Sequence, residues 1–360
     1  MSTRACYGRP VTTLRDVADP IVIGVYYDFP QHDGGAGFEG ALRLGLAERA
    51  DRLDRAVELR PLHAAGLPAG TERAVRDGFR ALDDAGVLLI VGPSISDNGL
   101  IVRDLADDAQ LPVINYTGGE ITRSEWMFHY QVGSLDEEPV VLAQHLAQRG
   151  LASAAVVYDD STVGRHYADS FVAAAADNDI EVLASAAVSS ITEDLSAVVK
   201  RLRDADPRSV CYLGVGMAAR PLAVSIKDLA WSVPVVANSA LMFGYIRKDW
   251  RADWEGWTYI DTIADDNPER VRLKERAPRT AAGSVGVAAY DIGRLIVDAI
   301  ARSGHLTRAG LRSGLERVKR MPATSGYAGT TMGFGVWDHA ALKGGSLVLR
   351  EWRGGRSVQL

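Results

Sequence analysis

The chain is poor in cysteine and lysine and has no long apolar run. Its two cysteines, Cys6 in a polar leader and Cys211 in an apolar segment, exclude a disulfide framework and a cysteine-based metal set. Six lysines and 34 arginines are scattered singly, and the net charge of -6 argues against a surface for nucleic acid or an anionic membrane. No segment approaches the ~20 apolar residues of a membrane span.

Enough apolar sequence is present for two domains of ordinary size. The 360 residues are 47% hydrophobic and 24% charged, which suits two lobes with separate cores. Residues 1–19 are predicted to be a disordered leader, which has no apolar core of a secretory signal and no lipoprotein-type segment before Cys6. As written, the sequence predicts a cytoplasmic location, and an extracytoplasmic one if the true start carries an export signal.

Short apolar runs alternate with amphipathic segments in the first part of the chain. Apolar runs this short, interleaved with helices, favour a parallel sheet that is covered on both faces. The expected elements are strands at 21–27, 56–62, 87–93 and 111–117, and helices at 38–53, 71–86 and 98–110.

The same alternation restarts near residue 137. Two successive series predict an α/β fold with two doubly wound parallel-sheet lobes. A long amphipathic helix is expected at 284–304, and a C-terminal hairpin is expected from 333–338 and 345–355. The second series comprises strands at 153–160, 180–188, 209–215 and 233–239, and helices at 137–150, 164–179, 194–207 and 217–230.

One glycine pattern is typical of dinucleotide sites. Residues 214–219 match G-x-G-x-x-A between a strand and a helix, but the following VPVVANSALM lacks the acid that would hold the ribose. An NAD-linked enzyme is therefore the least favoured of the hypotheses. No nucleophile elbow, phosphate-binding loop or metalloprotease helix occurs, and no further ligand is spaced to join His32 and Asp33 in a metal site. The sequence predicts a protein that is not an enzyme and uses no cofactor or metal.

Five loops rich in small residues follow predicted strands. Each could be a simple turn or cap, but ligands in open α/β sheets bind outside the carboxyl ends of the strands. The first loop also precedes a helix, whose hydroxyls and first N–H groups can hold an anion or a carbonyl. Five such loops at equivalent ends predict a cleft between two facing sheets. They are SISDN (94–98), YTGGE (116–120), DDSTVG (159–164), GVGM (214–217) and ANSALMFGY (237–245).

In order and spacing, these segments resemble the type I periplasmic binding proteins. The resemblance is to the Leu/Ile/Val-binding branch with its cytoplasmic amide-sensor relatives, and it runs from Ile21 nearly to the C-terminus through IVIGVYYDFP, VLLIVGPSISDN, LPVINYTGGEIT, SAAVVYDDSTVGRHYADSF and GVAAYDIGRLIVDAI. It implies two hinged lobes joined by three crossovers near 132–136, 262–266 and 335–337. The implied division is 20–134 plus 265–335 for lobe I, and 135–264 plus 336–360 for lobe II.

The resemblance also implies which residues bind the ligand. Ser96 matches the serine that holds a ligand carboxylate in amino-acid-binding relatives, and Gly118 and Gly119 fall at the position of the binding amides. The implied set combines the strand-end loops with a polar loop near the mouth of the cleft: His32, Asp33, Ser96, Asp97, Tyr116, Thr117, Gly118, Gly119, Val163, Gly216, Met217, Asn238 and Ser239.

Three loops depart from the amino-acid-binding pattern, and one of them is GVGM (214–217), which lacks the expected tyrosine. Asn238 or Ser239 stands where relatives place an acid for the ligand ammonium, and Val163 replaces an aromatic residue. A buried ammonium without an anionic partner is costly, so ordinary α-amino acids are not expected to bind unless His32–Asp33 or Glu120 reaches in. The expected ligand is an organic molecule with substantial apolar surface and a carboxylate, amide or carbonyl group. Residues that could line its apolar part are Tyr116, Met217, Met242, Phe243 and Tyr245.

Two roles follow from the resemblance. In the first, the protein is the non-catalytic solute-binding component of an ABC-type uptake system, with an ABC permease as its partner. In the second, which the absence of an export signal favours, it is a cytoplasmic sensor that acts through a regulatory protein and forms a homodimer through lobe I. Both roles require a small organic ligand, and neither involves nucleic acid.

Overall fold

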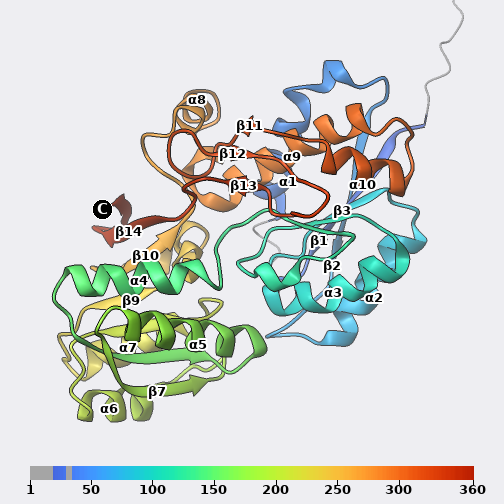
Figure 1. Ribbon diagram of the computed structural model, residues 1–360. Coiled ribbons are helices and arrows are strands. Elements are labelled where there is room, and N and C mark those ends of the chain that lie inside the picture. Colours follow the sequence, from blue (N-terminus) through green and yellow to red (C-terminus); the bar gives the residue numbers. More distant parts are fainter. Residues whose placement is uncertain (1–18, 30–34) are drawn as a thin grey trace, which may run out of the picture.

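The computed structural model describes residues 19–29 and 35–360. It contains two large, mainly parallel sheets, each with helices on both faces (Figure 1). The predicted α/β fold with two doubly wound lobes is confirmed. The predictions for the leader up to residue 18, and for His32 and Asp33, lie outside the described residues.

The first sheet has the strand order β2-β1-β3-β4-β5, with all neighbours parallel. Side chains alternate between its faces: Ile23 and Val25 of β1 belong to the cluster that includes α1 and α9, whereas Tyr26 packs with α2 and α3. Its strands are β1 (Ile21–Tyr27), β2 (Val57–His63), β3 (Leu89–Val91), β4 (Val113–Asn115) and β5 (Met127–His129). Its helices are α1 (Gly35–Ala47), α2 (Glu72–Asp84), α3 (Ser96–Ala109), α9 (Ser284–Arg302) and α10 (Arg308–Glu316).

The second sheet has the order β15-β14-β10-β9-β8-β6-β7, in which β14 and β15 are antiparallel additions. Val157 and Tyr212 face the side covered by α6 and α7, while Val156 and Cys211 face α4 and α5. The strands are β6 (Ser153–Asp159), β7 (Glu181–Val188), β8 (Val210–Leu213), β9 (Val235–Ala237), β10 (Thr258–Asp261), β14 (Val348–Arg353) and β15 (Arg356–Gln359). The helices are α4 (Glu137–Gln148), α5 (Thr162–Asp177), α6 (Ser196–Asp204) and α7 (Ala219–Asp228).

The chain passes between the sheets three times. The first two passages follow β5 and β10, the second of them leading into α8 (Pro268–Arg276). After α10 the chain forms a small sheet of β11 (Met321–Pro322), β12 (Thr331–Met332) and β13 (Leu342–Lys343). Ala340 bridges His129 of β5, and β14 then joins the second sheet. The expected third crossover near 335–337 and the boundaries of the two lobes stay predictions.

The C-terminal hairpin differs from the expected one. Residues 334–338 form a turn closed by Gly335 and Asp338, and the hairpin joins β14 to β15 through Gly354 and Gly355. These glycines have φ of 55° and 70°, the left-handed values that a two-residue hairpin turn requires. The prediction that residues 333–338 form the first strand of the hairpin was wrong. Their apolar residues are typical of a strand, but the Gly-Gly pair that makes the hairpin turn lies after β14.

Helix α9 and helix α1 pack with their backbones in close approach. A Cβ atom at Gly45 would lie 2.0 Å from the carbonyl oxygen of Tyr290, and one at Gly293 would lie 2.4 Å from that of Leu42. The glycines therefore let the two helices approach closely and cover one face of the first sheet. In the part of the chain that the structure describes, no helix, α9 included, has the length and apolar character to cross a membrane.

Candidate functional site

A pocket with a cavity volume of about 210 Å³ lies at the carboxyl ends of strands from both sheets. The first sheet contributes loops after β1, β3 and β4, and the second contributes loops after β6, β8 and β9. The predicted cleft between the two sheets is therefore present. Its lining comprises Tyr27, Phe29, Phe38, Ser94, Ile95, Ser96, Tyr116, Gly118, Val132, Asp159, Ser161, Val163, Gly164, Tyr167, Gly214, Val215, Asn238, Ser239, Ala240, Met242, Phe243, Ile246 and Val285.

The loop after β3 is organised by the fully buried carboxylate of Asp28. Its Oδ1 accepts hydrogen bonds from the N–H and the hydroxyl of Ser94 at 2.9 and 2.7 Å. Its Oδ2 accepts from Ile95 N–H and from Asn98 Nδ2, both at 2.9 Å. Four donors on one carboxylate fix the loop where it turns into α3.

Ser96, the first residue of α3, presents a free hydroxyl at the pocket. No hydrogen bond within residues 19–29 and 35–360 engages its Oγ, unlike that of Ser94, which donates to Asp28. The first N–H groups of a helix have no intrahelical partner, and the N-cap residue Ile95 supplies no side-chain cap here. The hydroxyl, the start of α3 and the nearby Gly118 thus offer hydrogen-bond donors on the first-lobe side.

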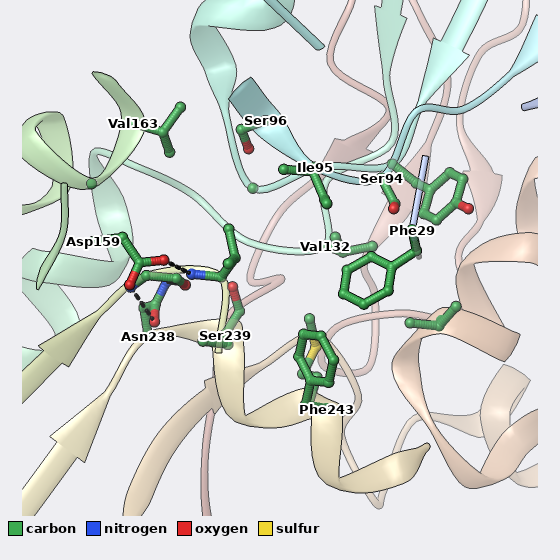
Figure 2. A pocket seen from close by; sticks show the side chains of 18 of the residues that line it. Phe29, Ser94, Ile95, Ser96, Val132, Asp159, Val163, Asn238, Ser239 and Phe243 are labelled. Atoms are coloured by element: carbon green, nitrogen blue, oxygen red, sulfur yellow. Dashed lines mark hydrogen bonds between the residues drawn. The ribbon is translucent and has the colours of Figure 1, made fainter. Parts of the chain in front are cut away.

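Aromatic side chains gather at one end of the pocket. Figure 2 shows Phe29 and Phe243 facing each other there, with ring centroids 5.0 Å apart. Phe38 of α1 stacks on Tyr116 at 4.6 Å and meets Tyr27 edge to face at 6.0 Å. Such rings provide a large apolar contact surface for a ligand body.

Asp159 lies at the other end of the pocket, near Asn238 (Figure 2). Its carboxyl group accepts hydrogen bonds from Tyr212 Oη at 3.0 Å and from Val215 N–H at 2.8 Å. Burial raises the pKa of Asp159 to about 6, although these two hydrogen bonds and a third from Ser190 lower it. A Cβ at Gly214 would lie 2.4 Å from the Asp159 carboxyl, so this glycine permits close approach within the protein.

A second buried acid stands behind the pocket wall. Glu138 accepts hydrogen bonds from the N–H and hydroxyl of Ser239, at 2.6 and 3.0 Å, and from Tyr167 Oη at 3.2 Å. Burial raises the pKa of Glu138 to about 7. Glu120 does not reach the pocket but hydrogen-bonds Ser134 Oγ and the N–H of Leu135 in the first passage.

The structure brings together six of the residues expected to bind the ligand. These six line the pocket, while their assignment as ligand contacts stays a prediction: Ser96, Tyr116, Gly118, Val163, Asn238 and Ser239. Met242 and Phe243 line it too, but Tyr245 donates a hydrogen bond to Asp261 at 2.5 Å instead.

The other expected residues lie beside the pocket or outside the described part. Asp97 accepts from the N–H of Val163 at 3.4 Å, and burial raises its pKa. Thr117 Oγ1 accepts from Gly119 N–H at 3.1 Å and so shapes the loop after β4. Gly216 packs against Ala240 and Phe243. Neither it nor Met217 is among the lining residues, and His32 and Asp33 are not described.

Sequence reasoning missed several lining residues. Tyr27 and Phe38 lie in a strand and a helix whose aromatic residues look like ordinary core. Phe29 is the second residue after β1, and its place just beyond a strand end could have indicated a role in the pocket. Among the described residues, no group of three His, Cys, Asp or Glu side chains is placed to hold a metal ion.

The comparisons with known proteins agree with this architecture. A periplasmic binding protein type 1 from Bordetella pertussis Tohama I is 17% identical, with a TM-score of 0.81 over 95% of this chain and 100% of that one. An ABC transporter substrate-binding protein from Desulfitobacterium hafniense, in complex with Leu, is 19% identical, with a TM-score of 0.78 over the same shares. An ABC transporter solute-binding protein from R. palustris, in complex with 4-hydroxybenzoate, is 17% identical, with a TM-score of 0.78 over 95% and 96%.

A comparison with curated protein sequences finds no match. The family model described as "Periplasmic binding protein" matches residues 20–342, which is most of the chain. The solved structures share its two-sheet fold across nearly their whole length. The expected resemblance is thereby confirmed, and the chain belongs to the periplasmic binding protein family.

Proposed function

We propose that this protein binds one small organic ligand between its two lobes, without converting it, and delivers it to an ABC-type permease. The observation that carries the proposal is the pocket itself, which draws its lining from strand ends of both sheets. Closure of two lobes over a ligand would bury the ligand on both sides. The solved relatives named as ABC transporter binding proteins support the transport role.

The ligand is an apolar organic molecule that carries a carboxylate, amide or carbonyl group. Its body fits the aromatic end at Phe29 and Phe243, and its polar oxygen fits the donors at Ser96 and Gly118. No Arg, Lys or His occurs among the described lining residues. The D. hafniense and R. palustris proteins hold Leu and 4-hydroxybenzoate, and both compounds combine an apolar body with a carboxylate.

Native purification tests the proposal directly. Mass spectrometry of small molecules released from the unheated protein is expected to show one organic compound of this class in near-stoichiometric amount. The same compound should rebind to the stripped protein in a calorimetric titration. The proposal would be contradicted if the ligand-free protein bound no compound of this class and instead converted a compound into a product.

Replacing Ser96 by alanine should weaken binding of the co-purified compound by about 1–3 kcal/mol, because a buried ligand oxygen would lose its donor. Calorimetric titration of wild type and variant measures the difference. Ser232→Ala, at an exposed position, is the matched control and should bind like wild type. Equal affinities of all three proteins would show that the Ser96 hydroxyl faces no ligand oxygen.

A further inference from the structure

The second-lobe wall of the pocket is backed by a carboxyl group that does not itself line the pocket. Glu138, the second residue of α4, is fully buried. Its Oε2 accepts from the N–H of Ser239 at 2.6 Å, and its Oε1 accepts from the N–H of Ser134 at 2.7 Å. These backbone donors hold the carboxyl group between the first passage and the loop after β9.

Two hydroxyl groups of lining residues are turned toward this carboxyl group. Ser239 Oγ donates to Glu138 Oε1 at 3.0 Å, and Tyr167 Oη donates to the same oxygen at 3.2 Å. A hydroxyl group has one proton, so each of them keeps only acceptor lone pairs for a ligand. The carboxyl oxygens of Asp159 in the same wall are acceptors too. Asn238 Nδ2 in the same wall already donates to the carbonyl oxygen of Gly214 at 3.0 Å. The hydroxyl and carboxyl groups of the second-lobe wall therefore accept hydrogen bonds, whereas Ser96 on the first-lobe side can donate them.

We infer that Glu138 is a positioning residue that sets the hydrogen-bond polarity of this wall, so that the pocket selects a ligand with an N–H or O–H donor beside its carbonyl group. The inference rests on the proposed function, because it requires a ligand in the pocket, and it narrows the ligand class. The carbonyl oxygen faces Ser96 and Gly118, and the donor faces Ser239 and Tyr167.

The charge around Glu138 makes this polarity depend on pH. The titratable groups that face it are Glu120 after β4, Tyr167 of α5 and Cys211 of β8, and none of them is a cation. Burial raises the pKa of Glu138 to about 7, and the charge of Glu120 adds a smaller effect in the same direction. The hydrogen bonds from Ser239 and Ser134 lower this pKa but do not outweigh burial. Above this pH the carboxylate takes both hydroxyl protons. Below it the protonated carboxyl donates a hydrogen bond itself and turns one hydroxyl proton toward the pocket.

A pair of neutral probes isolates the donor. 3-Phenylpropanamide and methyl 3-phenylpropanoate share the aromatic body and the carbonyl group, but only the amide carries N–H, and neither titrates between pH 5 and 9. Wild type at pH 8 is expected to bind the amide about tenfold more tightly than the ester, the value of one well-placed hydrogen bond. Glu138→Gln should reduce this ratio to about threefold or less. Glu137→Gln, at the exposed neighbouring position, should keep it.

The wild-type pH series covers the case in which Glu138→Gln does not fold. The amide-to-ester ratio should fall on acidification, with a midpoint near pH 7 rather than near pH 6, where Asp159 titrates. The role of Glu138 is overturned if the wild-type amide-to-ester ratio does not change with pH, or if folded Glu138→Gln keeps the wild-type ratio. Either result leaves the proposed function standing. If wild type binds neither probe while it still binds its co-purified compound, the inference alone fails; if it binds nothing, both fail.

Discussion

Replacing Asp28 by alanine is expected to lower the free energy of unfolding by about 3–5 kcal/mol. The carboxylate is fully buried and accepts hydrogen bonds from Ser94, Ile95 and Asn98. Its removal leaves several buried donors without an acceptor, and each such donor carries a desolvation cost. Urea denaturation of the purified protein measures the loss.

The same substitution should also weaken ligand binding, because Asp28 fixes the loop that presents Ser94 and Ser96 to the pocket. Asp104→Ala on α3 is the matched control, since the Asp104 side chain is 69% exposed and pairs with its neighbour Arg103. It should change the free energy of unfolding by less than about 0.5 kcal/mol. A similarly small loss for Asp28→Ala would contradict the role assigned to this carboxylate.

Gly45→Ala should destabilise the protein by more than about 3 kcal/mol, at the upper end of overpacking effects. The added Cβ would lie 2.0 Å from the carbonyl oxygen of Tyr290 and 3.1 Å from Cα of Gly293. The obstacle is backbone, so a rotamer change cannot relieve it, and α1 must move away from α9. Since Phe38 of α1 and Val285 of α9 both line the pocket, ligand affinity should fall as well.

Gly40→Ala provides the comparison within the same helix. Gly40 is exposed, and a Cβ there would meet no atom within 4 Å. Alanine is favoured over glycine in a helix by about 1 kcal/mol, so this variant should be as stable as wild type or more so. Thermal unfolding of the two variants side by side checks the pair. Equal melting temperatures of the two variants would contradict the prediction, because they would show that α1 can move away from α9 at little cost in stability.

The elements with strong apolar runs could be predicted from the sequence. Strand β1 has the expected bounds, Ile21–Tyr27, because seven apolar, aromatic or small residues stand between Pro20 and Asp28. Strand β5 was not predicted, since its three residues become a strand only through pairing with β4. Helix α8 was also missed, although Asn267 caps it and Pro268 begins it, because its polar composition hid this start signal.

The pocket could be predicted in its general position and in part of its lining. Ser96 and Gly118 follow from the rule that ligands bind beyond the carboxyl ends of parallel strands. Glu138 could not be found in this way, because Asp-Glu-Glu-Pro reads as the solvated start of a helix. Its burial depends on Ser239, 101 residues further along the chain, and sequence periodicity does not report contacts at that separation.

Helix α9 covers the first sheet, yet the chain reaches it only after nearly all of the second lobe. During synthesis, therefore, strands β1 to β5 leave the ribosome long before their covering helix exists. The first sheet therefore waits for α9, whereas β6 to β9 can collapse with their own helices in the meantime, and β14 and β15 join the second sheet last. From the end of β5 at residue 129 to the start of α9 at residue 284, the nascent chain consequently carries an incompletely covered apolar sheet face, a surface of the kind that molecular chaperones protect.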